Sequence, residues 1–311
     1  MKPDVLVAGA GVSGLTSGIR LAEAGFQVRI VAAEMPLDTT SAAAGAIWGP
    51  AYVDHPEVPR WGDEGLRIFT DLAGDAGAGV RMLTGVEASR VPTSAAPWVH
   101  GATAAGPGDL PDGWASGWRF RAPVIDMPVY LQWLLKRYEA TGGELIRGRL
   151  TRLEDGLADA PVVVNCTGLG ARALTGDDTL AASRGQIVVV ANPGVEEFFV
   201  EMTDDPELAY LLPQGDRLLL GGCTIAGDES PGIDPLMARR IIDRCAAVRP
   251  EVRDAEVLGH RVGFRPIRPT VRLERDGSII HNYGHGGAGI TLSWGCATDV
   301  VALAREIAQD R

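Results

Sequence analysis

Three of the four arginines in the segment GHRVGFRPIRPTVRLE, residues 259–274, stand within eight residues of one another. Arg265, Arg268 and Arg272 lie among apolar residues and near prolines that restrict the backbone. Surface arginines usually form salt bridges, but three in this setting predict that at least one faces inward. A guanidinium can bind a carboxylate through two parallel hydrogen bonds. The segment therefore indicates a site that grips a carboxylate.

A glycine-rich turn near the N-terminus has the spacing of a phosphate-binding turn. Gly9, Gly11 and Gly14 form G-x-G-x-x-G directly after the apolar run Val5–Ala8, which predicts a buried parallel strand. A helix and a second strand, 27–31, are expected to follow. Glu34 then comes where an acid can accept a hydrogen bond from a ribose hydroxyl. This arrangement favours dinucleotide binding over the alternative, a purely structural glycine turn.

A second glycine-rich loop lies near the C-terminus. The residues 284–289, GHGGAG, separate a predicted strand, 279–283, from a helix that runs to Ile307. The N–H groups at the start of such a helix can point at a ligand. His281 and His285 are four residues apart, but the glycine-rich loop between them is not helical and no third ligand is evident. We therefore expect no metal site.

Apolar periodicity predicts the elements that position these residues. Helices are expected at 65–72, at 124–141 with Asp126 as N-cap, and at 237–248, and residues 95–117 read as loop. A strand is expected at 161–165, before small residues that suit the edge of a nucleotide site. The segments 184–190, 198–202, 209–212 and 217–222 predict an antiparallel sheet inserted in the parallel fold. Further short strands are expected at 80–83, 86–91, 144–146 and 149–153.

Composition excludes several classes of function. The net charge of −11 argues against nucleic acid and against anionic membrane surfaces as partners, and the apolar runs are too short to span a bilayer. The 311 residues are 46% apolar, enough to bury a core. The four cysteines, Cys166, Cys223, Cys245 and Cys296, are scattered and no secretory signal precedes them, so we expect buried free thiols and a cytoplasmic location.

The chain resembles the D-amino acid oxidase family of FAD-dependent enzymes, and in particular its small microbial members. The matching blocks stand in family order and span nearly the whole chain: VAGAGVSGL, TTSAAAGAIW, VVVNCTGLGARAL followed by RGQ, YLLP, GFRPIRPTVRLE and HNYGHGGAGITLSWGCA. The resemblance implies an α/β fold in which a Rossmann-like, FAD-binding parallel sheet carries an inserted antiparallel-sheet substrate domain. The FAD-binding domain is expected to comprise residues 1–50, 124–182 and 259–311, and the substrate domain residues 51–123 and 183–258.

The same resemblance assigns roles to single residues. Arg265 should clamp the α-carboxylate of the substrate, and Tyr210 should hydrogen-bond the same group, although its apolar neighbours by themselves suggest a structural tyrosine. Gly287 should accept from the substrate amine through its carbonyl, and Thr291 should lie near the flavin C2 carbonyl. The residues expected to contact FAD are Gly9, Ala10, Gly11, Val12, Ser13, Gly14, Glu34, Thr39, Thr40, Ala44, Gly45, Leu150, Thr167, Gly286, Gly287, Ala288, Gly289, Ile290 and Thr291.

The implied reaction is oxidation of a D-amino acid by hydride transfer to flavin N5, without a catalytic base. Oxygen then gives hydrogen peroxide, and water converts the imino acid to a 2-oxo acid and ammonia. The rival readings are a D-aspartate oxidase, for which no additional cation is identifiable, a glycine or sarcosine-type amine oxidase, and a non-catalytic FAD- or NAD-binding module. The oligomeric state, a homodimer included, is left open.

Two departures from the family concern the substrate pocket. The segment 203–209 is short and lacks the tyrosine of the longer family lids, which suggests a more open pocket. Glu201, Asp204, Asp205 and Glu207 lie nearby in sequence. We therefore hypothesise a preference for neutral or basic side chains.

Overall fold

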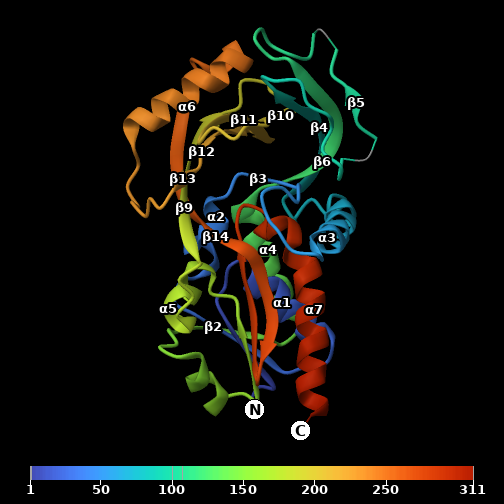
Figure 1. Cartoon of the computed structure of the whole chain (residues 1–311), viewed down its shortest axis with the longest axis vertical. Helices are drawn as coiled ribbons and strands as arrows, with labels where there is room; N and C mark the ends of the chain where they lie inside the picture. Colours follow the sequence, from blue (N-terminus) through green and yellow to red (C-terminus); the bar gives the residue numbers. More distant parts are fainter. Residues whose placement is uncertain (1, 100, 107, 311) are drawn as a thin grey trace.

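The computed structural model describes residues 2–99, 101–106 and 108–310. Its strands form one continuous 15-stranded sheet in the order β3-β6-β4-β10-β11-β12-β9-β14-β15-β8-β1-β2-β7, with β13 and β5 attached to its sides. The molecule is elongated, with helices α1 and α7 and both termini at one end and α6 with β10, β11 and β12 at the other (Figure 1). The strands are β1 (Val5–Ala8), β2 (Val28–Ala32), β3 (Ala46–Ile47), β4 (Val80–Ser89), β5 (Thr103–Ala104), β6 (Ser116–Ile125), β7 (Glu144–Arg147), β8 (Val162–Asn165), β9 (Ala181–Ala191), β10 (Phe198–Glu201), β11 (Glu207–Gln214), β12 (Arg217–Cys223), β13 (Ile225–Ala226), β14 (Val257–Asp276) and β15 (Ile279–His285).

The helices cover the sheet in two groups. Helix α1 packs against α4 and α7 at the end that holds the termini, and α6 packs on β9, β11 and β12 at the other end. The helices are α1 (Val12–Glu23), α2 (Thr40–Ala43), α3 (Val58–Leu72), α4 (Met127–Ala140), α5 (Ala171–Thr175), α6 (Pro235–Val248) and α7 (Gly289–Gln309). In the described residues no helix is long and apolar enough to cross a membrane.

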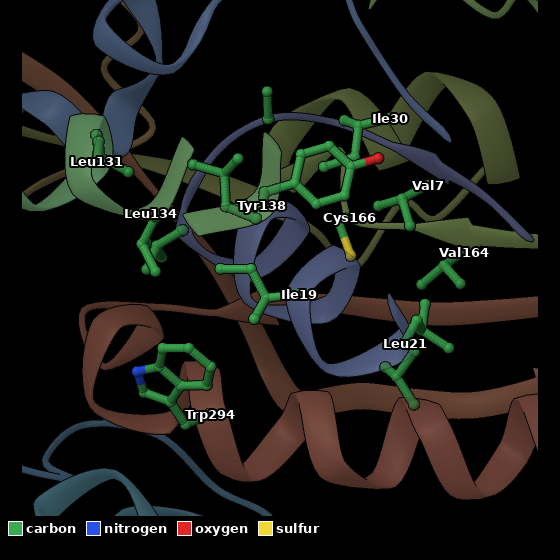
Figure 2. Close-up of a cluster of buried hydrophobic side chains, with 14 of the residues drawn as sticks. Val7, Ile19, Leu21, Ile30, Leu131, Leu134, Tyr138, Val164, Cys166 and Trp294 are labelled. Atoms are coloured by element: carbon green, nitrogen blue, oxygen red, sulfur yellow. The ribbon is translucent and has the colours of Figure 1, made fainter. Parts of the chain in front are cut away.

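The first of these groups covers a parallel sheet. Strands β15, β8, β1, β2 and β7 pair in parallel. The central strands β8 and β1 are rich in buried valine, as expected where helices cover a parallel sheet, whereas β7 at the edge has no buried residue. Leu15, Ile19 and Leu21 of α1 are fully buried there, and α4 adds Tyr138, whose hydroxyl donates to the Val28 carbonyl at 2.9 Å. Figure 2 shows this cluster, with Ile19 between Tyr138 and Trp294. The core thus fixes the strand ends from which the site residues emerge.

The other half of the sheet is mainly antiparallel. Strands β10, β11, β12, β9 and β14 pair antiparallel in that order, which confirms the predicted inserted sheet. One exception is the parallel pair β10–β4. Strand β14 joins the two halves, because its 20 residues pair first with β9 and then with β15.

Several predicted elements need correction. The two strands expected at 80–83 and 86–91 are the single strand β4, and the predicted helix at 65–72 begins earlier, at Val58. Residues 124 and 125 end strand β6, so α4 begins after Asp126, whose side chain makes no cap bond but pairs with Arg217 at 2.6 Å. The expected strand 149–153 is not a strand: bends lead into a 3-10 helix, Leu153–Ala158. At β4 and β6, long antiparallel pairing outweighed the local pattern.

Candidate functional site

A cavity of about 770 Å³ opens along the carboxyl ends of the parallel strands. Its walls come from the segments that follow β1, β2 and β8, from residues 38–47 and 148–151, and from β9, β14 and the loop before α7. This edge is where nucleotides bind in open α/β sheets. Most residues predicted to contact a cofactor line it, namely Gly9, Ala10, Gly11, Val12, Ser13, Glu34, Thr39, Thr40, Ala44, Gly45, Leu150, Thr167, Gly286, Gly287, Gly289, Ile290 and Thr291.

Two predicted contacts, Gly14 and Ala288, do not line the cavity. A Cβ on Gly14 would collide with the carbonyl oxygen of Gly9, so this glycine lets α1 pack on the turn that precedes it. Ala288 is buried beneath the second glycine loop, in a cluster with Trp61 and Leu292. Both residues shape the cavity from behind.

The glycine turn has the form that its spacing predicts. Gly9 has a φ of 105°, which favours glycine, and a Cβ there would strike the Cys166 carbonyl. Helix α1 begins after Gly11, and the N–H of Val12 donates to Ser41 Oγ at 3.1 Å. Ser41 also lines the cavity. The Ser41 hydroxyl therefore holds the turn itself, a role that its position in the sequence does not predict.

The threonines of the 39–40 segment are held by backbone. Thr39 Oγ1 donates to the Pro36 carbonyl at 2.7 Å, and Thr40 Oγ1 accepts from the Phe264 N–H at 2.7 Å. Thr40 therefore ties α2 to β14, next to Arg265. At the start of α7, Thr291 Oγ1 accepts from the Gly49 N–H at 3.1 Å. These bonds join segments far apart in sequence around the cavity.

Arg265 lies in the cavity wall, on β14. A Cβ on Gly185 would lie 2.8 Å from its Nη1, and a Cβ on Gly287 would lie 3.7 Å from its Cδ. Its Nη1 donates to the Cys223 carbonyl at 3.1 Å. The Arg265 guanidinium thus lies against Gly185, which has no side chain, and its Cδ lies beside Gly287. The predicted carboxylate clamp and the predicted amine acceptor are neighbours.

Tyr210 meets this wall from strand β11. Its ring lies over Gly221, where a Cβ would collide with it, and its hydroxyl lies 3.0 Å from where a Cβ on Gly45 would be. Burial raises the pKa of Tyr210, against the effect of the nearby Arg265 charge. Among the described residues none hydrogen-bonds this hydroxyl, so it is free to serve a ligand beside Arg265. Tyr210 does not itself line the cavity, but its hydroxyl lies beside Gly45, which does.

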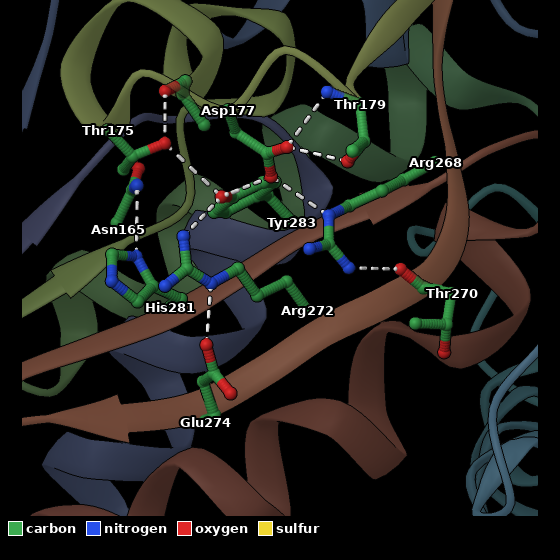
Figure 3. Close-up of polar contacts among 11 residues, drawn as sticks. Asn165, Thr175, Asp177, Thr179, Arg268, Thr270, Arg272, Glu274, His281 and Tyr283 are labelled. Carbon is green, nitrogen blue, oxygen red and sulfur yellow. Dashed lines mark hydrogen bonds and ion pairs between the residues drawn. The ribbon is translucent and has the colours of Figure 1, made fainter.

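The other two arginines of the segment point elsewhere. Arg268 Nε donates to Asp177 Oδ2 at 2.8 Å, and Arg272 Nη1 donates to the Tyr283 hydroxyl at 2.8 Å. Figure 3 shows how Tyr283 and Asp177 connect the two guanidinium groups. Burial by itself would raise the pKa of Asp177. Hydrogen bonds from Thr179, Arg268 and Tyr283 outweigh burial and hold that pKa well below its ordinary value. This network anchors β14 and leaves Arg265 as the guanidinium of the three that faces the cavity.

Two buried thiols and the buried His285 are neutral at pH 7. Burial raises the pKa of the thiols of Cys166 and Cys245 to about 12. It lowers the pKa of His285 to about 4, and His285 Nε2 hydrogen-bonds Asn282 Oδ1 at 3.0 Å. His281 contacts Asn165 at 3.4 Å. Within residues 2–99, 101–106 and 108–310 no cluster of His, Cys, Asp or Glu could hold a metal ion.

The register places two further charged residues in line with Tyr210. Paired residues run across one face of the sheet from Glu87 on β4 through Val200, Tyr210, Gly221 and Ile187 to Arg261 on β14. The sequence reasoning found neither Glu87 nor Arg261, because which residues share a row depends on strand pairing. The Arg261 Nη1 is buried without a partner among the described residues. Burial lowers the pKa of Arg261, and Asp126 opposes that shift.

The acids of the 201–207 segment are arranged differently from the hypothesis. Glu201 is buried on the opposite face of the sheet, where it accepts from Arg90 at 2.9 Å and from the Ala209 N–H at 2.8 Å. Glu207 pairs with Arg240 and Arg244. Asp205 caps the turn by accepting from the Glu207 N–H. Of the four, only Asp204 is exposed and not engaged in this way.

Comparisons with known proteins define the class. A family model described as FAD dependent oxidoreductase matches residues 4–303. The fold is shared with glycine oxidase from Geobacillus kaustophilus, at a TM-score of 0.83 and 18% identity over 98% of this chain and 95% of that one. The chain is therefore an FAD-dependent oxidoreductase by family and by fold.

Relatives narrow the class further. The chain is 44% identical to the D-amino-acid oxidase of Rubrobacter xylanophilus over 96% of this chain and 95% of the relative. It is also 44% identical to the D-amino-acid oxidase of Streptomyces coelicolor, over 97% and 96%. The chain belongs to the D-amino acid oxidase family.

Proposed function

We propose that the protein oxidises D-amino acids to 2-oxo acids with FAD, consuming oxygen and water and releasing ammonia and hydrogen peroxide. The observation that carries the proposal is that Arg265 and Gly287 lie side by side in the cavity wall, with the Tyr210 hydroxyl beside Gly45, which also lines the cavity. A zwitterion presents a carboxylate and an amine to these groups. The carboxylate would lie between the guanidinium and the hydroxyl, and the amine at the Gly287 carbonyl.

The residues present fit FAD. The glycine turn leaves space above Gly11, the start of α1 favours a pyrophosphate, and Glu34 lines the far part of the cavity where a ribose would lie. Thr39, Leu150 and Thr167 line the same part, and Gly45, Ile290 and Thr291 line the part near Arg265. Bound FAD supplies the two-electron oxidant at that end and hands the electrons to oxygen.

The chain's own contribution is placement. Arg265 and Tyr210 fix the carboxylate and Gly287 fixes the amine, so the Cα–H of a D-amino acid has one orientation. An L-amino acid held by the same groups would direct its side chain where the D-isomer directs its Cα–H. Burial keeps the Cys166 and Cys245 thiols protonated and makes His285 a weak base, so none of these groups is suited to take up a substrate proton. Orientation of this kind can lower a barrier by several kcal/mol, on the order of 7 or more in well-aligned systems.

The first test removes the Arg265 guanidinium, the proposed carboxylate-binding group. Arg265→Ala should retain bound FAD and its yellow colour, because the cofactor is held mainly by other residues. Two charge-assisted hydrogen bonds are worth about 3 to 5 kcal/mol, so kcat/KM for D-alanine should fall roughly a hundredfold or more. Arg305→Ala, an exposed arginine on α7, is the matched control and should behave as wild type.

The readout is peroxide formation together with anaerobic bleaching of the flavin by D-alanine. Equal bleaching by L-alanine, or full turnover of Arg265→Ala, would contradict the proposal. A flavoprotein that no amine bleaches would instead be a non-catalytic binding module.

D-aspartate oxidation is the second candidate, and Arg261 is the observation that favours it. We propose that neutral and basic side chains are preferred, because Glu87 adds a negative charge to the face that carries Tyr210. Rates with D-valine, D-lysine and D-aspartate separate the two candidates. We also propose a cytoplasmic location, which the four free buried thiols support.

A further inference from the structure

A charge gradient runs along the sheet face that carries Tyr210. Arg261 and Arg265 stand on β14, whereas Glu87 stands on β4, and the paired row Glu87–Val200–Tyr210–Gly221–Ile187–Arg261 connects the two strands. Strand order places β10, β11, β12 and β9 between them. Arg265 lines the cavity at the cationic end of this arrangement, and the anionic residue lies at the other end of the row.

Glu87 is not used by the fold. Burial raises the pKa of its carboxyl, and among the described residues no hydrogen bond or ion pair holds that group. The neighbouring acid Glu201 shows the contrast, since it faces the other side of the sheet and is satisfied by Arg90 and the Ala209 N–H. A half-buried carboxylate without a partner costs stability unless a ligand pairs with it.

A second unpaired group stands beside Glu87. Trp118 on β6 is its cross-strand partner, and the Trp118 Nε1 is buried without a hydrogen-bond partner in the described chain. An indole next to a carboxylate suits a cation, because the ring face attracts positive charge and the carboxylate pairs with it. Tyr52, in the loop before α3, is largely exposed. Desolvation, and then the charges of Glu87 and Asp204, raise the pKa of its hydroxyl.

We propose that Glu87 selects D-amino acids with cationic side chains, D-lysine and D-arginine, by pairing with the terminal ammonium or guanidinium. This inference rests on the proposed function. It identifies the residue that would bind the end of the substrate farthest from Arg265.

The spacing agrees with a side chain of that length. The Tyr210 ring leans over Gly221, so its hydroxyl lies about three strand spacings, or roughly 14 Å, from the strand of Glu87. A lysine zwitterion is roughly 9 Å from carboxylate oxygen to Nζ when extended. Hydrogen bonds of about 2.8 Å at each end complete the span. Side chains of one or two carbons leave Glu87 unpaired.

The test compares D-lysine with D-norleucine, which has the same four-carbon chain without the charge, in the FAD-loaded enzyme. Glu87→Gln keeps the shape and removes the charge. The ratio of kcat/KM for D-lysine to that for D-norleucine should fall roughly tenfold, while kcat/KM for D-alanine stays at the wild-type value. Glu154→Gln, which alters an exposed acid by the same charge, should leave the ratio unchanged.

A second variant keeps the proposal testable if Glu87→Gln folds poorly. Glu87→Asp retains the charge on a shorter stem and should lower the ratio less than Glu87→Gln. Bound FAD and the D-alanine rate report whether each variant is folded. An unchanged ratio in folded Glu87→Gln overturns the role of Glu87 and leaves the proposed function intact. Wild-type enzyme that oxidises no D-amino acid overturns the proposed function instead.

Discussion

The arginines and the tyrosine near the cavity differ in whether their side chains are hydrogen-bonded to other side chains of the fold. Arg265 and Tyr210 have side-chain groups that remain free to bind a ligand, while Arg268 and Arg272 are fixed by Asp177 and Tyr283. Arg265, Arg268 and Arg272 therefore have different roles. One guanidinium faces the cavity and the other two hold the strand in position.

His285 is a buried residue whose charge state couples stability to pH. Its folded pKa of about 4 lies below the unfolded value near 6.5, so the unfolded state binds a proton more readily between these pH values. Stability should therefore fall as pH drops through this window. The loss between pH 7 and pH 5 should be about 2 kcal/mol from this group.

His285→Gln removes the titrating ring and keeps an amide N–H that can donate to Asn282. Urea unfolding of both proteins at pH 7 and pH 5, with FAD in excess, measures the difference. The variant should lose less stability on acidification than wild type does. Equal losses would show that His285 does not titrate as its burial implies.

At the scale of elements, glycines set how closely the helices pack. Helices α3 and α7 cross where a Cβ on Gly65 would strike the Thr291 carbonyl and a Cβ on Gly295 would strike Trp61. This contact supports the first turn of α7, which lines the cavity at Ile290 and Thr291. The position of α3 therefore bears directly on the site.

Gly295→Ala should force the two helices apart. Overpacking of this kind costs about 1 to 3 kcal/mol, and FAD affinity should fall with it because the loop before α7 must shift. Urea unfolding and fluorescence titration with FAD measure both effects. Gly232→Ala is the control, since nothing lies within 4 Å of the added methyl group. A wild-type stability for Gly295→Ala would mean that the helices can separate without cost.

At the scale of the whole molecule, the cavity joins segments from both ends of the chain. Gly9 to Ser13 from the N-terminal turn and Val262 to Thr291 near the C-terminus line one space, with β14 connecting the two halves of the sheet. A ligand that fills this space contacts the native state only. It should therefore stabilise the whole fold.

Removal of FAD should lower the melting temperature of the protein. A ligand at a hundred times its Kd stabilises by about 2.7 kcal/mol, which for a chain of this size corresponds to a rise of roughly 5 °C when FAD is restored to apoenzyme. Differential scanning calorimetry checks this, with NAD as the matched dinucleotide. A larger shift with NAD than with FAD would contradict the assignment of the cavity.

The sequence by itself determined the local elements and the chemistry of the motifs. Spacing alone indicated the turn at Gly9, the second glycine loop and an inward-facing arginine, because glycine geometry, capping and apolar periodicity act over a few residues. The resemblance to a known family added Arg265, Tyr210 and Gly287 as a group. Their roles in binding remain the proposals tested above.

Only the tertiary structure decided which distant residues share a face. Glu201 looked like a pocket acid, but strand pairing puts it on the opposite face, where Arg90 neutralises it. Glu87 and Arg261 lie far apart in the sequence, yet register places them in one row with Tyr210. Sequence reasoning could not find that row, because a shift of one residue in any strand would turn its side chains to the other side of the sheet.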